Sequence, residues 1–187
     1  MTTATQQQIV NGLDTAAIRA TIEDVAAHPE KGQTKWAVTT EWKGGTRSDA
    51  RATYCEIGGQ RIAKDFTLRA DEPIELCGTN QFANPQEFLM AGLNACMTVG
   101  YVMTCAMNGI ELEELRIETE GNIDLRGMFQ LSDKVPVGYD SLRYTVHIKG
   151  KATPEEFQKV HETVMATSPN YFNLANAIAM KSRLVVK

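Results

Sequence analysis

The stretch NPQEFLMAGLNACMTVGY, residues 84–101, decides the fold because it begins a long helix with readable start signals. Asn84 is a good N-cap, Pro85 suits the first helical position, and Glu87 falls three residues after the cap. Asn108-Gly109 is a typical C-terminal stop. The sequence therefore predicts one central helix of about 24 residues, about 36 Å long.

This helix carries no charged residue from Phe88 to Met107, which is the length of a bilayer span. The run is nevertheless rich in Ala, Gly, Thr and Cys and contains Asn94. Glu87, Glu111 and Glu113 flank it, rather than Lys or Arg. We therefore expect a buried central helix and no membrane. Because a helix that is apolar all round must be covered all round, we also expect a homodimer with this helix at its centre.

The rest of the chain alternates strands and helices within what we expect to be one domain. Ile18, Ile22 and Val25 share one face of a helix over residues 14–28, and Pro29 follows its end. Strands are expected at residues 35–42, 51–57, 61–68, 115–120, 142–148 and 178–186, and another helix at 153–166. After the first helix the order is β-β-β-α-β-β-α-β, which is typical of an α+β protein.

Composition excludes several classes of function. Nineteen basic residues against 23 acidic ones give a net charge of −4, so no nucleic-acid partner is expected. The start, MTTATQQQ, lacks the basic and apolar regions of a signal peptide, which favours a cytoplasmic protein with reduced thiols. No nucleotide-binding glycine motif occurs, so no cofactor is expected. His28, His147 and His161 lack metal-ligand spacing, so no metal is expected.

One face of the central helix is a strip of small residues: Gly92, Cys96, Gly100 and Thr104 follow one another at intervals of four. Such a strip lets another backbone approach closely. The approaching element is either a neighbouring helix of the same chain or the same helix of a second subunit.

Cys96 has two interpretations on these grounds. It is either a small apolar residue in a close helix contact or a nucleophile. Because the thiolate is the reactive form, and Cys96 lies beyond the first turn of the helix, activation requires a cation from elsewhere. Arg47 and Arg51 are the candidates, with Arg126 as a third. Cys105, nine residues further on, is expected to pack in the core.

These residues resemble the OsmC/Ohr family (osmotically inducible protein C and organic hydroperoxide resistance proteins). The resemblance rests on NPQEFLMAGLNACM, the helix end NGI and the strand LEELRIETEGNIDL. Shorter pieces add to it: Trp42 to Gly45, the tripeptide Asp71 to Pro73, and Ser168-Pro169. It implies an OsmC-like domain at residues 35–187, with residues 1–34 as an N-terminal extension that contains one extra helix.

The resemblance also implies an intertwined homodimer whose members reduce organic hydroperoxides with two cysteines. Cys96 matches the first cysteine, which attacks the peroxide. Arg51 or Arg47 matches the assisting arginine. This sequence departs from the family pattern twice: Gln86 stands where the family has a glutamate that holds the arginine, and Ser168 stands where the second cysteine directly precedes a proline.

Two functions follow from this pattern. The first is a thiol-dependent peroxidase that acts on organic hydroperoxides through Cys96 alone, in oxidative stress defence, with an external thiol as reductant. The alternative is a non-catalytic homodimer that binds an apolar small molecule in its interface cavity. Retention of Cys96 favours the first function, whereas Ser168 and Gln86 favour the second.

Overall fold

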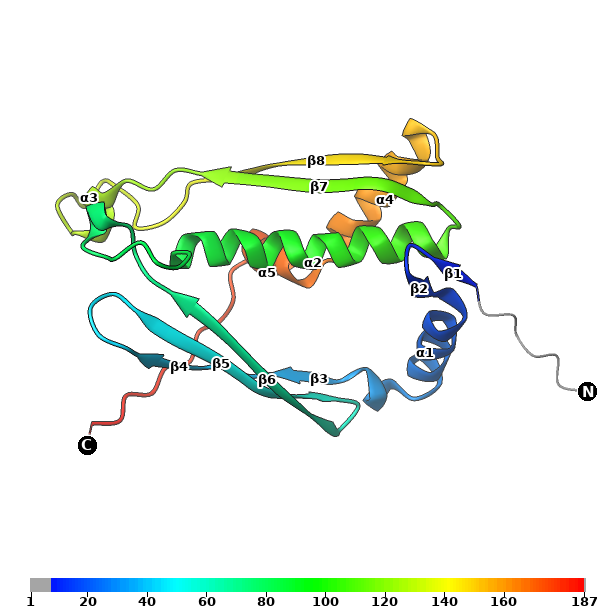
Figure 1. Ribbon diagram of the computed structural model, residues 1–187, viewed down its shortest axis with the longest axis horizontal. Coiled ribbons are helices and arrows are strands. Elements are labelled where there is room, and N and C mark those ends of the chain that lie inside the picture. Colours follow the sequence, from blue (N-terminus) through cyan, green and yellow to red (C-terminus); the bar gives the residue numbers. More distant parts are fainter. Residues whose placement is uncertain (1–7, 187) are drawn as a thin grey trace, which may run out of the picture. The chain divides into compact units, whose positions relative to one another are not determined.

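The computed structural model describes residues 8–186 and divides the chain into two compact units, Met1–Leu89 and Met90–Lys187 (Figure 1). Residues 1–7 of the expected N-terminal extension lie outside the described part of the chain. The boundary expected between residues 34 and 35 stays a prediction.

The first unit begins with the helix that the sequence predicts. α1 spans Thr15–Ala27 and follows a short hairpin of β1, Ile9–Val10, and β2, Leu13–Asp14. The Asp14 side chain caps the helix by accepting hydrogen bonds from the backbone N–H groups of Ala16 and Ala17. This cap satisfies two of the amides that a helix start leaves without partners.

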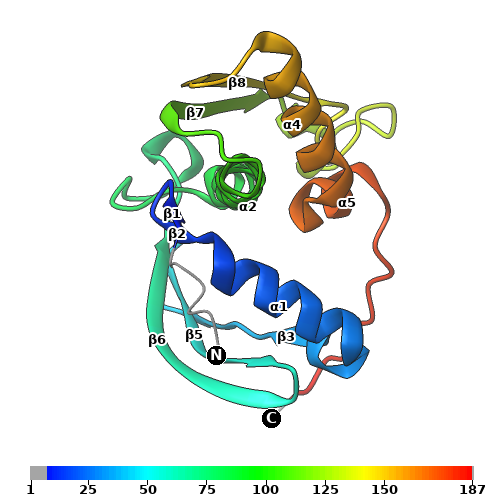
Figure 2. The ribbon, with the colours of Figure 1, turned by 90° about the vertical axis from the view of Figure 1, so that its right-hand side faces the viewer.

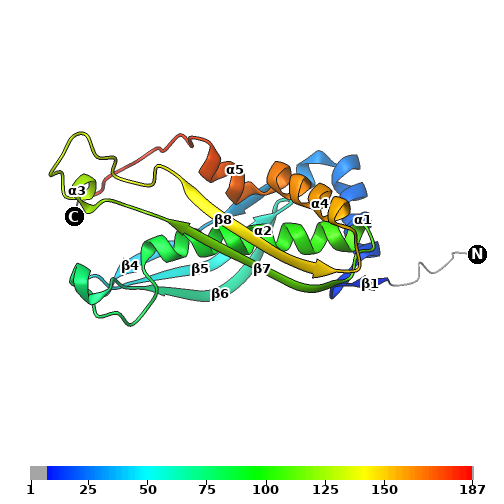
Figure 3. The ribbon, with the colours of Figure 1, turned by 90° about the horizontal axis from the view of Figure 1, so that it is seen from above.

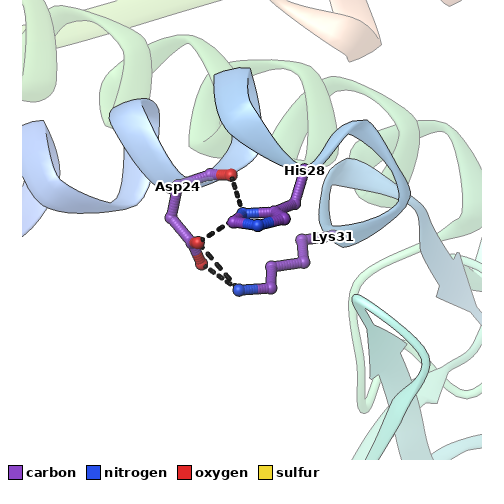
Figure 4. A network of polar contacts seen from close by, with 3 residues as sticks. All are labelled: Asp24, His28 and Lys31. Carbon is purple, nitrogen blue, oxygen red and sulfur yellow. Dashed lines mark hydrogen bonds and ion pairs between the residues drawn. The ribbon is translucent and has the colours of Figure 1, made fainter.

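A network of polar contacts lies on the surface at the C-terminal end of α1 (Figure 4). The Asp24 carboxylate accepts hydrogen bonds from Lys31 Nζ at 2.7 and 2.8 Å and lies 3.0 Å from His28 Nδ1. The hydrogen bond from Lys31 lowers the pKa of Asp24. Lys31 belongs to a 3-10 turn, η1, at Pro29–Gly32, so the network links the helix end to the turn that follows it.

The first unit also contains an antiparallel sheet. Its central strand is β5, Ser48–Ile57, with β6, Gln60–Ala70, on one edge. β3, Thr34–Trp36, and β4, Thr39–Trp42, both pair with β5 on its other edge. The single strand expected at residues 35–42 is therefore interrupted, whereas the two following strands are confirmed.

The hairpin between β5 and β6 turns at Gly58-Gly59, as the sequence predicts. Their φ angles are +55° and +77°, and Ile57 pairs with Gln60 across the turn. A two-residue turn with both φ angles positive is the type that matches the twist of a hairpin, and glycine adopts it without strain.

A buried carboxylate holds the loop that precedes the central helix. Asp71 is fully buried and accepts hydrogen bonds from Thr46 Oγ1 at 2.6 Å, Thr79 Oγ1 at 2.5 Å and the Gln81 N–H at 3.3 Å. These hydrogen bonds, led by the one from Thr46, hold the pKa of Asp71 well below its usual range. The loop contains a 3-10 turn, η2, at Ile74–Leu76.

The central helix α2 spans Pro85–Met107 and confirms both predicted end signals. The Asn84 side chain accepts from the Glu87 N–H at 2.9 Å, and the Glu87 carboxylate accepts from the Asn84 N–H at 2.7 Å. At the other end Gly109 has a φ of +72°, and the Ile110 N–H donates to the carbonyl of Cys105. From Met90 onward α2 belongs to the second unit.

In the second unit, a hairpin and two helices pack around α2. The hairpin consists of β7, Leu112–Gly121, and β8, Leu142–Gly150, and it crosses over α2 (Figure 3). α4, Pro154–Thr167, and α5, Pro169–Ala175, lie beside α2 on the same side of the hairpin (Figure 2). The core consists of buried residues from α2, α4 and the turn after α2: Leu93, Met97, Tyr101, Cys105, Ile110, Val160 and Val164.

Two details of this unit were not expected. The long connection between β7 and β8 contains a short helix, α3, at Leu125–Met128. Ser168-Pro169 ends α4, as predicted, but it also begins α5, since Ser168 caps that helix and Pro169 takes its first position.

The face of the hairpin that carries alternating charges is solvated, as the sequence predicts. Arg143 Nε lies 3.1 Å from Glu120, Lys149 Nζ lies 2.6 Å from Glu113, and all four side chains are exposed. The opposite face packs on α2, and there the side-chain amide of Asn94 donates a hydrogen bond to the backbone carbonyl of Ile117. The one polar side chain noted in the uncharged run thus joins helix to strand.

The prediction of a strand at residues 178–186 is wrong for the single chain. These residues adopt no regular structure, and Met180, Leu184 and Val186 are 89, 87 and 83% exposed. The alternation of apolar side chains indicates a strand, but a strand also needs a neighbouring strand for its N–H and C=O groups. No strand of the described chain supplies one.

By length and composition, α2 is long and apolar enough to cross a membrane, and within residues 8–186 it is the single helix of which this is true. The core helix of a soluble protein passes the same test. Leu93, Met97, Tyr101 and Cys105 recur every four residues and are all buried against the second unit's own elements. This packing supports the interpretation as a core helix.

Candidate thiol site

Cys96 lies on the face of α2 that the small residues form, and α4 and α5 cover this face. Asn170 Nδ2 donates a hydrogen bond of 2.8 Å to the carbonyl of Gly92. Val164 packs on Gly100 so closely that a Cβ atom there would lie 3.2 Å from Val164 Cγ1. The structure thus selects the first of the two alternatives, a neighbouring helix of the same chain.

Ser168 meets the Cys96 side chain at the junction of α4 and α5. Its Oγ lies 3.4 Å from Cys96 Sγ and donates toward the sulfur, and it accepts from the Tyr171 N–H at 3.3 Å. The Ser168 N–H donates to the carbonyl of Val164 at 2.8 Å. Ser168 is 5% exposed, whereas Cys96 is half-buried. Backbone contacts of both helices therefore fix the hydroxyl against the thiol.

The other thiols have different surroundings. Cys105 is fully buried in the core, and this burial raises the pKa of its thiol. Its predicted role in packing is confirmed. Cys55 is buried within β5, and Cys77 is exposed in the loop that follows β6. All four cysteines are free thiols.

Arg47, Arg51 and Gln86, the residues expected to assist Cys96, all belong to the first unit and have exposed side chains. Arg51 Nη2 lies 3.6 Å from the Asp65 carboxylate. Gln86 lies on the same helix as Cys96 but ten residues earlier, about 15 Å along the axis. It can therefore act on this thiol only through another residue, and the role of the arginines stays a prediction.

Arg126, the third candidate, is held by its own neighbour. Its Nε lies 2.9 and 3.0 Å from the Asp124 carboxylate oxygens, and Nη2 adds a further hydrogen bond of 2.5 Å. The contact with Arg126 lowers the pKa of Asp124 to about 2.

Sequence reasoning missed one polar contact between α2 and α4. The Tyr101 hydroxyl is hydrogen-bonded to His161 Nδ1 of α4. The spacing of Tyr101 marks it as a core residue, but nothing in a single sequence tells which residue of another helix its hydroxyl meets. Within residues 8–186, no three His, Cys, Asp or Glu residues gather in a way that would hold a metal ion.

The fold and this site define an α+β protein with a thiol on its central helix. The Ser168 hydroxyl, at the junction of α4 and α5, contacts this thiol. The family model described as OsmC-like protein matches residues 78–183, which is more than half of the chain. The chain therefore belongs to the OsmC family, and the predicted family and fold class are confirmed.

Solved structures share this fold. An OsmC-like protein from Mycoplasma pneumoniae is 16% identical with a TM-score of 0.60, over 75% of this chain and 87% of that one. An OsmC-like protein of unknown function from Vibrio cholerae is 15% identical with a TM-score of 0.52, over 74% of this chain and 92% of that one. No curated protein matches this chain in sequence.

Proposed function

We propose that this protein reduces organic hydroperoxides through Cys96 and is regenerated by an external thiol. The observation that carries the proposal is the position of Ser168, whose Oγ lies 3.4 Å from Cys96 Sγ. The family resemblance assigns this position to the second cysteine. The short distance between the two side chains supports the proposal that this site corresponds to a two-cysteine site with one of the two sulfurs replaced by oxygen.

The first half of the reaction needs a single thiol. The Cys96 thiolate attacks the terminal oxygen of the peroxide, the O–O bond breaks, and the alkoxide leaves and takes up a proton to become an alcohol. The sulfur loses two electrons and becomes a sulfenic acid. Ser168, as a hydroxyl donor beside the sulfur, stabilises negative charge there.

The second half requires two reducing thiols from solution, because serine forms no disulfide. One thiolate attacks the sulfenic sulfur and releases water, which leaves a mixed disulfide with Cys96. A second thiol then attacks this bond, releases the external disulfide and restores the Cys96 thiol. A reducing cytoplasm, the location that we propose, supplies such thiols.

We further propose that the working form is a homodimer. Val99, on α2, is 58% exposed, and in residues 178–186 Met180, Leu184 and Val186 are more exposed still. A second copy would cover this surface. In this arrangement Arg51 or Arg47 assists the thiol, and Gln86 orients the arginine as a hydrogen-bond partner.

The proposal is tested by following the consumption of cumene hydroperoxide in the presence of a dithiol. The wild-type protein and Cys77→Ser, whose exposed thiol serves as the matched control, are expected to consume it equally. Cys96→Ser is expected to lose turnover while keeping its fold by circular dichroism. Turnover that survives in Cys96→Ser contradicts the proposal. A wild-type protein without turnover would favour the alternative, a non-catalytic dimer that binds an apolar molecule.

A further inference from the structure

A cavity lies in the second unit, apart from the thiol site. It has a volume of about 870 Å³, within the range of sites for small organic molecules. One wall is the inner face of β8, with Tyr144, Val146 and Ile148, and the other is α4, with Phe157, His161 and Met165. Neither Cys96 nor Ser168 belongs to its lining.

Tyr101 and His161 form a hydrogen-bonded polar pair in the lining of this cavity. Tyr101 is 1% exposed, and burial raises the pKa of its phenol, so the hydroxyl stays protonated. A neutral phenol donates readily, and His161 Nδ1 is its partner. When Nδ1 accepts this hydrogen bond, the neutral ring carries its own hydrogen on Nε2. Within the described chain Nε2 has no partner, so it is available as a donor.

The remaining lining supplies rings and neutral surface. The His161 ring lies 6.1 Å from the Tyr101 ring in a stacked arrangement and 6.4 Å from the Tyr144 ring. The charged residue Lys149 at the rim is occupied by Glu113 at 2.6 Å, and the Gln158 amide donates to Glu162 at 3.0 Å. Within the described chain, the cavity therefore combines aromatic walls with neutral donors, of which His161 Nε2–H is one, and its lysine is paired with a carboxylate.

We propose that this cavity binds a small aromatic molecule that carries one oxygen acceptor, with His161 Nε2–H donating to that oxygen. Tyr144 and Phe157 contact the ring of the ligand. Tyr101 does not touch the ligand but selects the tautomer of His161. This site is independent of the proposed peroxidase reaction at Cys96.

Two probes of nearly equal shape isolate the acceptor: 2-acetylnaphthalene has a carbonyl oxygen and 2-ethylnaphthalene has none. Binding is followed by the side-chain nitrogen signals of the full-length protein labelled in its three histidines, and by titration of each probe. We expect 2-acetylnaphthalene to bind with a Kd of about 1 mM or tighter and to shift the His161 signals. It should bind about three- to tenfold more tightly than 2-ethylnaphthalene, as one hydrogen bond implies.

Three variants complete the test. His161→Phe keeps a ring in place and should abolish the preference for the acetyl probe, whereas His147→Gln, on the solvated face of β8, should leave it unchanged. Cys96→Ser should bind both probes as the wild-type protein does. Equal affinity of the wild-type protein for both probes, absence of binding, or a preference that survives in His161→Phe overturns the proposal. Loss of binding in Cys96→Ser would place the probe at the thiol site and overturn it as well.

Discussion

Cys96 and Cys105 lie nine residues apart on α2, and the surroundings of the two thiols differ throughout. Cys105 points into the core and is fully buried, and its burial raises the pKa of the thiol. Cys96 is half-buried on the face of small residues and meets the Ser168 hydroxyl. Nine residues are two and a half turns, so the two side chains leave opposite faces of the helix. Orientation on the helix separates a packing thiol from a candidate nucleophile.

The largest effect is expected from Ser168→Cys, which would give the Cys96 region a second sulfur. Because the Ser168 Oγ already lies 3.4 Å from Cys96 Sγ, a thiol there can attack the Cys96 sulfenic acid within the chain. Peroxide should then yield a disulfide between residues 96 and 168, detected by peptide mapping, even without external thiol. The double variant Cys105→Ser, Ser168→Cys should form the same disulfide, because Cys105 takes no part in it. Failure of the disulfide to form would contradict the assigned geometry.

The two thiols should also differ in their rates of alkylation. Since burial raises the pKa of Cys105 and shields its sulfur, iodoacetamide at pH 8 should modify Cys105 at least about tenfold more slowly than Cys96. The difference should narrow as pH rises, because more of the Cys105 thiol is then ionised. Site-resolved mass spectrometry over a series of times measures both rates. Equal rates at pH 8 would show that the two surroundings do not differ as described.

Cys105→Ser tests the packing role of the second thiol. It places a hydroxyl in an apolar core. Because burying a polar group without a hydrogen-bond partner costs about 1–3 kcal/mol, the free energy of unfolding should fall by about that amount. Urea unfolding measures the change, and Cys77→Ser at an exposed position is the control, with an effect within about 0.5 kcal/mol. An equal effect of the two substitutions would be evidence against a tightly packed Cys105.

The smallest effects concern the two glycines on either side of Cys96. Ala at position 92 meets its nearest neighbour, Asn170, at an ordinary 3.8 Å, so Gly92→Ala should stabilise the helix by about 0.5–1 kcal/mol. Gly100→Ala gains the same helix propensity but crowds Val164 at 3.2 Å, so its net effect should be neutral or destabilising. Urea unfolding ranks the pair. A more stable Gly100→Ala would mean that α4 approaches Cys96 less closely.

The local signals of α2 could be read from the sequence, because a helix start and end depend on neighbouring residues. Asn84, Glu87 and Gly109 behave as predicted. The alternation that predicts a strand at residues 178–186 is equally clear, yet the single chain forms none, because pairing needs a neighbouring strand that the local sequence does not contain.

The candidate site was predictable only in part, for the same reason. Residue type and helical spacing single out Cys96 and its strip of small neighbours, but they leave open whether α4 or a second copy covers the strip. Contacts such as Ser168 with Cys96 join residues 72 positions apart, and Tyr101 with His161 joins residues 60 apart. Only the family resemblance pointed to Ser168, and nothing pointed to His161 as the partner of Tyr101.

The most direct test of the account is the site of the first oxidation. The reduced protein is treated with one equivalent of cumene hydroperoxide in the presence of a dimedone-type trap for sulfenic acid, and the adduct is located by intact mass and peptide mapping. We expect one adduct per chain, on Cys96, formed faster than any on Cys55, Cys77 or Cys105. Labelling of Cys96 no faster than of the other three cysteines would contradict its assignment as the peroxide-reactive thiol.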